Sequence, residues 1–273
     1  MNLKEKYRLL VTNNDAIIAA NFYNVETLKG LLEAAKTAGV SLILQASKNT
    51  IDYLGMKTTV ALAKSMTEDY GVEGWLHLDH GNSVELVAEC LDAGFDSVMI
   101  DGSELSFEEN VSLTIRVVEL AKQYGVPVEA ELGYVAKLGQ KQNVDKFTQP
   151  QEAKAFIKKT NVDALAIAIG TAHGFYKETP RLDFELLKEI RKAVPDTLLV
   201  LHGSSGISDD DIIKAIVFGI NKINVATEFK NTFMKSLKKI LNSTDDIDLR
   251  RIFPYAIKEI SVLAKSKFNL LKE

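Results

Sequence analysis

The chain has 273 residues, of which 46% are hydrophobic and 26% charged, so it can bury a sizeable core. Its formal net charge of −4, without a basic run interleaved with aromatic residues, argues against nucleic acid as a partner. The single cysteine, Cys90, excludes an intrachain disulfide and fits a reducing cytoplasm, while the charged first residues and short apolar runs predict neither a signal peptide nor a membrane span.

Short apolar runs alternate with longer amphipathic segments along the whole sequence. The runs cover residues 16–21, 41–46, 74–79, 96–101, 126–132, 163–169, 197–202 and 221–226. Several are apolar at nearly every position, as expected of strands covered on both faces. The segments between them, such as 25–38 and 184–193, have helical periodicity. The pattern predicts an α/β fold, a closed (β/α)8 TIM barrel, with an open doubly wound sheet as the alternative; no linker divides residues 1–273 into domains.

Two stretches depart from the repeat. The segment 133–162 is long, and its first half has no clear period, which predicts a mobile loop over the barrel mouth followed by a helix from about Gln151. Beyond Thr227 the pattern predicts long helices with a break at residues 243–248. We expect this C-terminal extension, residues 228–273, to take part in oligomer contacts.

Polar residues follow nearly every apolar run, at the strand ends where (β/α)8 barrels carry their active sites. They are Asn21, Ser47, Asp79, His80, Asp101, Glu131, His173, His202, Asn224 and Thr227. The three histidines His80, His173 and His202 follow three different strands, which favours a catalytic zinc site with an open fourth position. Each histidine alone is equally well explained as a hydrogen-bonded strand-end residue, and imidazoles also bind other divalent metals.

Two short segments after the last two strands are candidate phosphate-binding loops. H-G-S-S-G (202–206) precedes a predicted helix with Ser208 as its N-cap, and N-V-A-T (224–227) follows the eighth run. Backbone N–H groups and helix N-termini at this end of the barrel favour an anion. The alternative for G-S-S-G is a simple flexible turn.

Six motifs, in order and in register, carry a resemblance to a known family. They are H-L-D-H-G-N-S (77–83), S-V-M-I-D-G-S (97–103), V-E-A-E-L-G (128–133), A-I-G-T-A-H-G-F-Y-K (168–177), L-V-L-H-G-S-S-G (199–206) and K-I-N-V-A-T-E (222–228). With them the protein resembles the class II, zinc-dependent fructose-bisphosphate aldolases, and particularly the branch of the tagatose-bisphosphate aldolases. The resemblance implies a lyase that reversibly cleaves a ketose phosphate into dihydroxyacetone phosphate and an aldehyde.

The resemblance also implies roles for individual residues. Zn²⁺ would be held by His80, His173 and His202, with Asp79 as the acid/base residue and Asp101 and Glu131 as a second cation site beside it. Substrate or phosphate contacts are implied for Asn21, Ser47, Gly174, Lys177, Gly203, Ser205, Asn224 and Thr227, with a monovalent cation near the phosphate as a further option. His77 has no implied role and is expected to be a packed strand residue.

The loop after the fifth run departs from the family pattern. The sequence reads E-L-G-Y-V-A-K-L-G-Q-K-Q-N, without the paired glycine and Glu-Asp pair that supply the family's second acid. Three interpretations stay open: an aldolase with another proton donor, an aldolase for a modified ketose 1-phosphate such as sulfofructose 1-phosphate whose anion binds Lys137 or Lys141, or a sugar-phosphate-binding homologue without turnover. A solvated loop face is the plain alternative for the lysines, and a zinc hydrolase using Asp79 is the alternative from another enzyme class.

The family resemblance further implies a homodimer or homotetramer. The motif D-L-R-R (248–251) falls where the family tends to carry D-P-R. Arg250 is therefore a candidate for contacting the distal phosphate of substrate in a neighbouring subunit.

Overall fold

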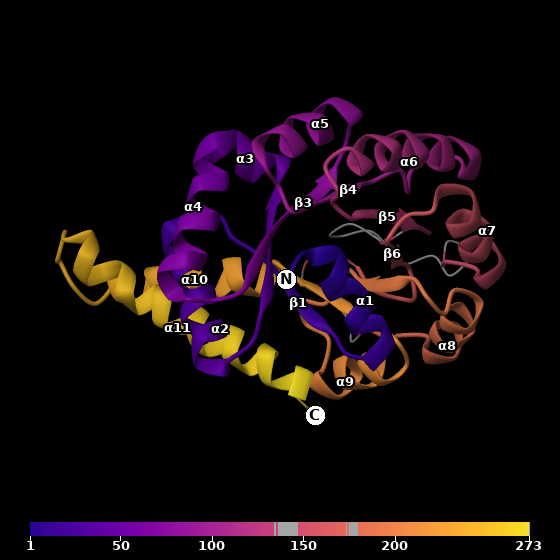
Figure 1. Cartoon of the computed structure of the whole chain (residues 1–273). Helices are drawn as coiled ribbons and strands as arrows, with labels where there is room; N and C mark the ends of the chain where they lie inside the picture. Colours follow the sequence, from indigo (N-terminus) through magenta and orange to yellow (C-terminus); the bar gives the residue numbers. More distant parts are fainter. Residues whose placement is uncertain (134, 136–146, 173, 175–179, 273) are drawn as a thin grey trace.

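A closed barrel of eight parallel strands forms the centre of the molecule (Figure 1). This computed structural model describes residues 1–133, 135, 147–172, 174 and 180–272. The strands pair in sequence order, and β8 closes the barrel on β1. They are β1 Ile17–Asn21, β2 Leu42–Ser47, β3 Gly74–Gly81, β4 Ser97–Ile100, β5 Val128–Leu132, β6 Ala164–Ile167, β7 Leu198–Leu201 and β8 Lys222–Val225. Each lies on one of the predicted apolar runs, so the (β/α)8 barrel is confirmed and the open sheet is excluded.

The helices form an outer ring and a C-terminal extension. They are α1 Leu3–Asn13, α2 Val25–Ala38, α3 Lys48–Leu54, α4 Met56–Tyr70, α5 Val84–Ala93, α6 Phe107–Lys122, α7 Pro150–Thr160, α8 Phe184–Ala193, α9 Asp209–Val217, α10 Thr227–Leu241, α11 Leu249–Asn269 and the 3-10 helix η2 Leu270–Lys272. The bounds of α2 and α8 match the predicted segments, and α7 begins one residue before the expected start. The predicted break between the last helices is confirmed, since α10 ends at Leu241 and α11 begins at Leu249.

Local side chains set these helix ends. Asn24 accepts a hydrogen bond from the backbone N–H of Thr27 at 2.9 Å and so caps α2, which ends at Gly39 in the left-handed conformation (φ 67°). Ser208 caps α9 as predicted, accepting from the N–H of Asp211 at 3.2 Å. Since α9 follows directly on the G-S-S-G loop, this cap also fixes where that loop ends.

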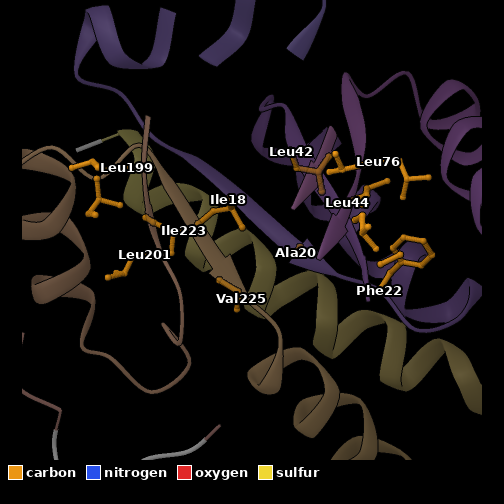
Figure 2. Close-up of a cluster of buried hydrophobic side chains, with 14 of the residues drawn as sticks. Ile18, Ala20, Phe22, Leu42, Leu44, Leu76, Leu199, Leu201, Ile223 and Val225 are labelled. Carbon is orange, nitrogen blue, oxygen red and sulfur yellow. The ribbon is translucent and has the colours of Figure 1, made fainter. Parts of the chain in front are cut away.

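Two apolar cores lie on either side of the strands. Alternate strand residues such as Ile18, Leu44 and Leu201 point outward and pack under the helices (Figure 2). A second cluster fills the inside of the barrel at its N-terminal end, where Tyr7 and Leu10 of α1 pack with residues of the strands. Because α1 closes this end, the polar strand ends at the opposite end are left to form a site. Helix α1 was not predicted from the sequence; it precedes the first strand and lies outside the strand–helix repeat.

The C-terminal helices pack against the barrel and then extend beyond it. Helix α11 lies so close to α2 that a Cβ atom built on Gly30 would come within 2.6 Å of Ile260 Cγ2. The end of α10 and the start of α11 project away from the rest of the molecule (Figure 1), and Ile247 between them is 92% exposed. Among the described residues, none of the helices has the length and apolar character to cross a bilayer.

Candidate active site

The end of β3 has an irregular backbone that positions Asp79 and His80. His80 adopts a left-handed conformation with φ 51°, and the pairing of β3 with β4 shifts register between Leu78 and Gly81. Successive side chains of a regular strand point to opposite faces, and a bulge re-aims them. Here the side chain of Asp79 turns toward β1 and β2, while that of His80 turns toward β4 and β7, so both belong to one site.

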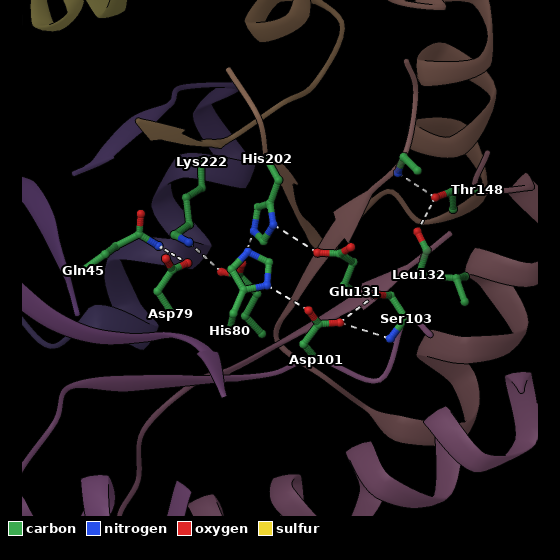
Figure 3. Close-up of polar contacts among 12 residues, drawn as sticks. Gln45, Asp79, His80, Asp101, Ser103, Glu131, Leu132, Thr148, His202 and Lys222 are labelled. Atoms are coloured by element: carbon green, nitrogen blue, oxygen red, sulfur yellow. Dashed lines mark hydrogen bonds and ion pairs between the residues drawn. The ribbon is translucent and has the colours of Figure 1, made fainter. Parts of the chain in front are cut away.

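Three side chains from three strands converge in what we call the candidate metal cluster, His80, Glu131 and His202 (Figure 3). One potential ligand atom from each lies within 4.8 Å of the others. The His80 and His202 rings pack edge to face with centroids 4.8 Å apart, and His202 Nδ1 lies 3.0 Å from Glu131 Oε2. Glu131, expected beside the zinc ligands as part of a second cation site, lies together with two of the expected zinc ligands.

These residues fit a divalent metal ion. In both histidines one ring nitrogen is held by a carboxylate: His80 Nδ1 donates to Asp101 Oδ2 at 2.8 Å, and His202 Nε2 donates to Glu129 Oε1 at 2.9 Å. This carboxylate–histidine arrangement is typical of metal ligands, because it fixes the ring and directs its second nitrogen to the metal. Glu131 Oε2 is buried and lies 3.0 Å from His202 Nδ1, so this pair brings a carboxylate oxygen and an imidazole nitrogen, two common metal-ligand atoms, to one point.

Asp79 is buried beside this cluster, with both carboxylate oxygens held. Asn21 Nδ2 donates to Oδ2 at 2.8 Å and Gln45 Nε2 donates to Oδ1 at 3.1 Å. Burial opposes the charged form, but the charges of His80 and His202 and the hydrogen bond from Asn21 lower the pKa of Asp79 below its ordinary value. Asp79 is therefore a fixed, ionised carboxylate at neutral pH.

Asp101 is likewise kept ionised. Burial would raise the pKa of Asp101, but the hydrogen bond and charge of His80 and the two hydrogen bonds from Ser103 lower it strongly. Ser103 donates its backbone N–H at 3.1 Å and its hydroxyl at 2.7 Å to Oδ1, which leaves Oδ2 for His80. Asp101 thus acts as the support of His80.

A pocket of about 510 Å³ opens from Asp79 between the ends of β1 and β2 and helices α3 and α10. Asn21 and Ser47, expected to contact substrate, lie on its wall, together with Tyr23 and Lys230. Lys230 Nζ lies 5.6 Å from the centroid of the Tyr23 ring. A cleft of about 650 Å³ at the N-terminal end of the barrel is larger, but it lies away from the cluster and is lined by residues such as Leu10 and Tyr70.

The two expected phosphate loops are tied to each other. The N–H of Glu228 donates to Ser205 Oγ at 3.3 Å, and Glu228 Oε1 accepts from the N–H of Gly206 at 3.1 Å. Thr227 begins α10, so a helix N-terminus faces this region, and the buried Asn224 Oδ1 has no hydrogen-bond donor among the described residues. Gly203 and Gly174 adopt left-handed conformations, with φ 65° and 94°.

Several buried polar residues that were not predicted from the sequence lie beneath the cluster. Glu129 and Lys222 are each about 1% exposed or less and form an ion pair of 2.7 Å, and Gln45 supports Asp79. A carboxylate or amine inside an otherwise apolar run is the signal that could have identified them. His77 is fully buried, as expected of a packed strand residue, and its Nδ1 bonds to Ser97 Oγ at 2.7 Å.

Some expected site residues are not placed with this group. His173, Lys177, Lys137 and Lys141 lie outside the described residues. Arg250 lies on the projecting start of α11. There it forms an ion pair of 3.0 Å with Asp248, and its side chain is 90% exposed. Within a single protomer, Arg250 does not contact the candidate active site.

Comparison with known proteins identifies the family. The model of the family "Fructose-bisphosphate aldolase class-II" matches residues 1–273, the whole chain. The crystal structure of the YdjI aldolase from Escherichia coli K12 is similar with a TM-score of 0.88 and 34% identity, over 99% of this chain and 96% of that one. Fructose-bisphosphate aldolase from Campylobacter jejuni shares the fold with a TM-score of 0.84 at 24% identity, over 99% and 94% of the two chains.

The match to this family over the full length agrees with the structure of the site. There the ends of the barrel strands bring together two histidines and three carboxylates, His80, His202, Asp79, Asp101 and Glu131. The resemblance inferred from the six motifs is confirmed. This chain belongs to the class II fructose-bisphosphate aldolase family and is a lyase.

Proposed function

We propose that the protein is a zinc-dependent aldolase that reversibly cleaves a ketose 1-phosphate or ketose bisphosphate into dihydroxyacetone phosphate and an aldehyde. The observation that carries the proposal is the position of Asp79. This ionised carboxylate lies beside the candidate metal cluster and at the same time on the wall of the adjoining pocket. A proton acceptor placed between a Lewis-acid site and a substrate-sized pocket is what carbon–carbon cleavage next to a carbonyl requires.

The residues divide the reaction between them. Zn²⁺, when held by His80, His202 and Glu131, supplies Lewis-acid stabilisation of the enediolate charge, with His173 as the further ligand that the family resemblance implies. Asp79 accepts the proton from the hydroxyl group on the departing carbon. Asn21 and Gln45 hold both oxygens of Asp79, so that it meets this hydroxyl in one orientation.

The phosphate of the dihydroxyacetone half is proposed to bind at the paired loops. Ser205, Asn224 and Thr227 lie at the N-terminus of α10, where backbone N–H groups favour an anion, and Gly203 belongs to the same loop as Ser205. The unpartnered Asn224 Oδ1 is suited to a cation or a donor brought in with the substrate. Gly174 and Lys177 complete this set by resemblance to the family.

The aldehyde half is proposed to occupy the pocket of about 510 Å³. Lys230 brings a positive charge to its wall beside the Tyr23 ring, which favours an aldehyde that carries an anionic or hydroxyl-rich end. This observation supports the second candidate, an aldolase for a modified ketose 1-phosphate such as sulfofructose 1-phosphate. Lys137 and Lys141 are proposed contributors to the same anion site.

The proposal is tested by metal analysis followed by a cleavage screen. Purified protein is loaded with Zn²⁺ or Co²⁺ and offered fructose, tagatose and sulfofructose phosphates, and release of dihydroxyacetone phosphate is followed by its enzymatic reduction. We expect activity with at least one ketose phosphate, its loss on treatment with a chelator, and its return with Zn²⁺. Metal-loaded protein that binds these sugars but releases no dihydroxyacetone phosphate would instead be a sugar-phosphate-binding homologue.

Exchange of the dihydroxyacetone phosphate C–H proton with solvent separates an aldolase from a hydrolase. An aldolase with a working second acid exchanges this proton in a metal-dependent reaction, whereas a zinc hydrolase using Asp79 to activate water does not. The same assay shows whether another group replaces the Glu-Asp pair that the loop after β5 does not contain.

We further propose a homodimer or homotetramer, formed through the C-terminal helices. The projecting start of α11 exposes Leu249 and Arg250 to solvent in a single protomer, and Ile247 precedes them. In such an assembly Arg250 would approach the pocket of a neighbouring subunit. We expect the protein to be located in a reducing cytoplasm. Sedimentation of the wild type and of an Ile247→Asp variant tests the assembly: the variant should dissociate, and a monomeric wild type would contradict the proposal.

A further inference from the structure

A series of buried charges joins three strands beneath the candidate metal cluster. Lys222 Nζ of β8 donates to Glu129 Oε2 of β5 at 2.7 Å, and Glu129 Oε1 accepts from Nε2 of His202, which follows β7, at 2.9 Å. The side chains of all three residues are fully buried. Figure 3 shows Lys222 and His202, whose side chains extend in the same direction toward His80.

This series of charges fixes which face of the His202 ring meets the cluster. An imidazole has two nitrogens, and a carboxylate that accepts from one of them selects both the rotation of the ring and the position of its proton. Because Glu129 holds Nε2, the Nδ1 atom is directed to Glu131 Oε2, 3.0 Å away. A ring turned over would lose the bond to Glu129 and bring a carbon atom to the cluster.

Lys222 holds Glu129 in the position from which Glu129 can orient the His202 ring. A carboxylate buried in the barrel needs an opposite charge, and Lys222 supplies it at the second oxygen. His77 packs against another side of the Glu129 carboxylate and restricts its movement. Its Nε2 lies 3.8 Å from Glu129 Oε2, while its Nδ1 bonds to Ser97. Both oxygens of Glu129 are therefore committed, one to Lys222 and the other to His202.

We infer that Lys222 and Glu129 are positioning residues, which hold His202 with Nδ1 toward the candidate metal cluster and so set the affinity and geometry of the bound metal. The inference rests on the proposed metal site. Apolar side chains of similar volume would fill the barrel without the cost of burying charges, so stability alone does not account for the pair. Groups that support a metal ligand typically change metal affinity by 10- to 100-fold when they are removed.

The test uses Co²⁺ and Zn²⁺ themselves as probes, on the full-length protein. Lys222→Met and Glu129→Gln are compared with the wild type and with Lys267→Met, a matched control, because Lys267 is another buried lysine whose ion pair of 3.0 Å to Asp209 lies outside the cluster. Metal affinity is measured by competition with a chromophoric chelator, and the visible absorption bands of the Co²⁺ form report the ligand geometry.

We expect Lys222→Met and Glu129→Gln to bind metal about 10- to 100-fold more weakly than the wild type, with altered Co²⁺ absorption bands. The affinity of the control, Lys267→Met, should stay within about twofold of the wild type. Folded Lys222→Met protein with wild-type affinity and unchanged bands would overturn the inference. A wild type that binds neither metal would instead overturn the proposed metal site, so the two failures are distinguishable.

A measurement on the wild type tests the inference even if Lys222→Met and Glu129→Gln do not fold. Nitrogen-15 NMR of histidine-labelled, zinc-loaded protein shows which ring nitrogen carries the proton. We expect the His202 signal to show a protonated Nε2 and a metal-bound Nδ1, assigned by its absence from His202→Gln. A proton on Nδ1 would refute the inference whatever the variants do.

Discussion

Asn21, at the end of β1, donates a hydrogen bond of 2.8 Å from its amide nitrogen to Oδ2 of Asp79, at the end of β3. Gln45 of the intervening strand β2 reaches the other oxygen at 3.1 Å. Two neighbouring strands, β1 and β2, therefore hold the carboxylate that β3 carries. An acceptor held in this way needs no reorientation before it takes a proton from substrate.

Replacing this carboxylate should remove most of the activity. We expect Asp79→Asn to lower kcat for cleavage by about 10²- to 10⁴-fold, because the amide keeps the shape of the side chain but cannot accept the proton. Metal affinity should change little, since Asp79 is outside the candidate metal cluster. Steady-state kinetics and chelator competition on the same preparation check both parts, and a variant with wild-type kcat would exclude Asp79 as the proton acceptor.

The stability of the metal-free protein should decrease in mild acid because of His77. Burial, and then the charge of Lys222, lower the pKa of His77 to about 3 from its ordinary 6.5. The unfolded protein therefore binds this proton at a higher pH than the folded one. The contribution of His77 is fully present above pH 6.5 and is lost as pH falls toward 3, by about 2 kcal/mol between pH 7 and pH 5.

Urea denaturation at a series of pH values measures this effect, and His77→Gln is its control. The variant cannot take up the proton, so its free energy of unfolding should vary less between pH 7 and pH 5 than that of the wild type. Equal pH dependence of the two proteins would show that His77 is not buried in its neutral form.

The contact between α2 and α11 should not tolerate a side chain at Gly30. A Cβ atom there would lie 2.6 Å from Ile260 Cγ2 and 2.8 Å from the backbone oxygen of Ile257. Because the oxygen belongs to the backbone, the helices must move apart, which we expect to cost about 1–3 kcal/mol in Gly30→Ala. Thermal and urea unfolding measure the loss; a more stable variant, as helix propensity alone would give, would contradict this close packing of the two helices.

Arg191 at the end of α8 should be a stability determinant outside the site. Its guanidinium donates to the carbonyl oxygens of Thr197 and Gly219, at 2.8 and 2.6 Å, and to Asn221 Oδ1 at 2.8 Å. We expect Arg191→Met to lower the free energy of unfolding by about 2–3 kcal/mol, because partly buried acceptors lose a charged donor. Arg250→Met, which removes an exposed arginine, should unfold like the wild type, and equal urea midpoints for the two variants would refute the role of Arg191.

Much of the barrel could be predicted because strands and helices of this fold have different periodicities. A continuous apolar run such as 163–169 predicts a strand covered on both faces, and the cap at Asn24 and the glycine at 39 mark the ends of α2. Helix α1 was missed, although its buried residues Leu3, Tyr7 and Leu10 have helical spacing and Asn2 and Glu5 form a capping box. This signal precedes the first strand and so lies outside the strand–helix repeat from which the fold was predicted.

The site was predictable where residues end strands, and not where they lie within them. Asp79 and His202 are the last residues of their runs and His80 directly follows one, and all three were identified from that position. Glu129 and Lys222 are inside their runs, and only the closed barrel brings their ends within 2.7 Å. The grouping of Glu131 with His80 and His202 likewise depends on how far each strand is staggered, which the order of residues does not specify.

The left-handed conformation of His80, at the end of β3, bears on how the substrate specificity of this site can change. Asp79 and His80 are sequence neighbours, and the irregular backbone at His80 turns one side chain toward Asn21 and Gln45 and the other toward Asp101 and His202. Their Cα atoms are kept about 3.8 Å apart by covalent geometry, and their side chains are held by residues at or next to barrel strands, Asn21, Gln45 and Asp101. The surrounding loops are consequently free to accumulate substitutions and accept new sugars while this reactive unit keeps its dimensions.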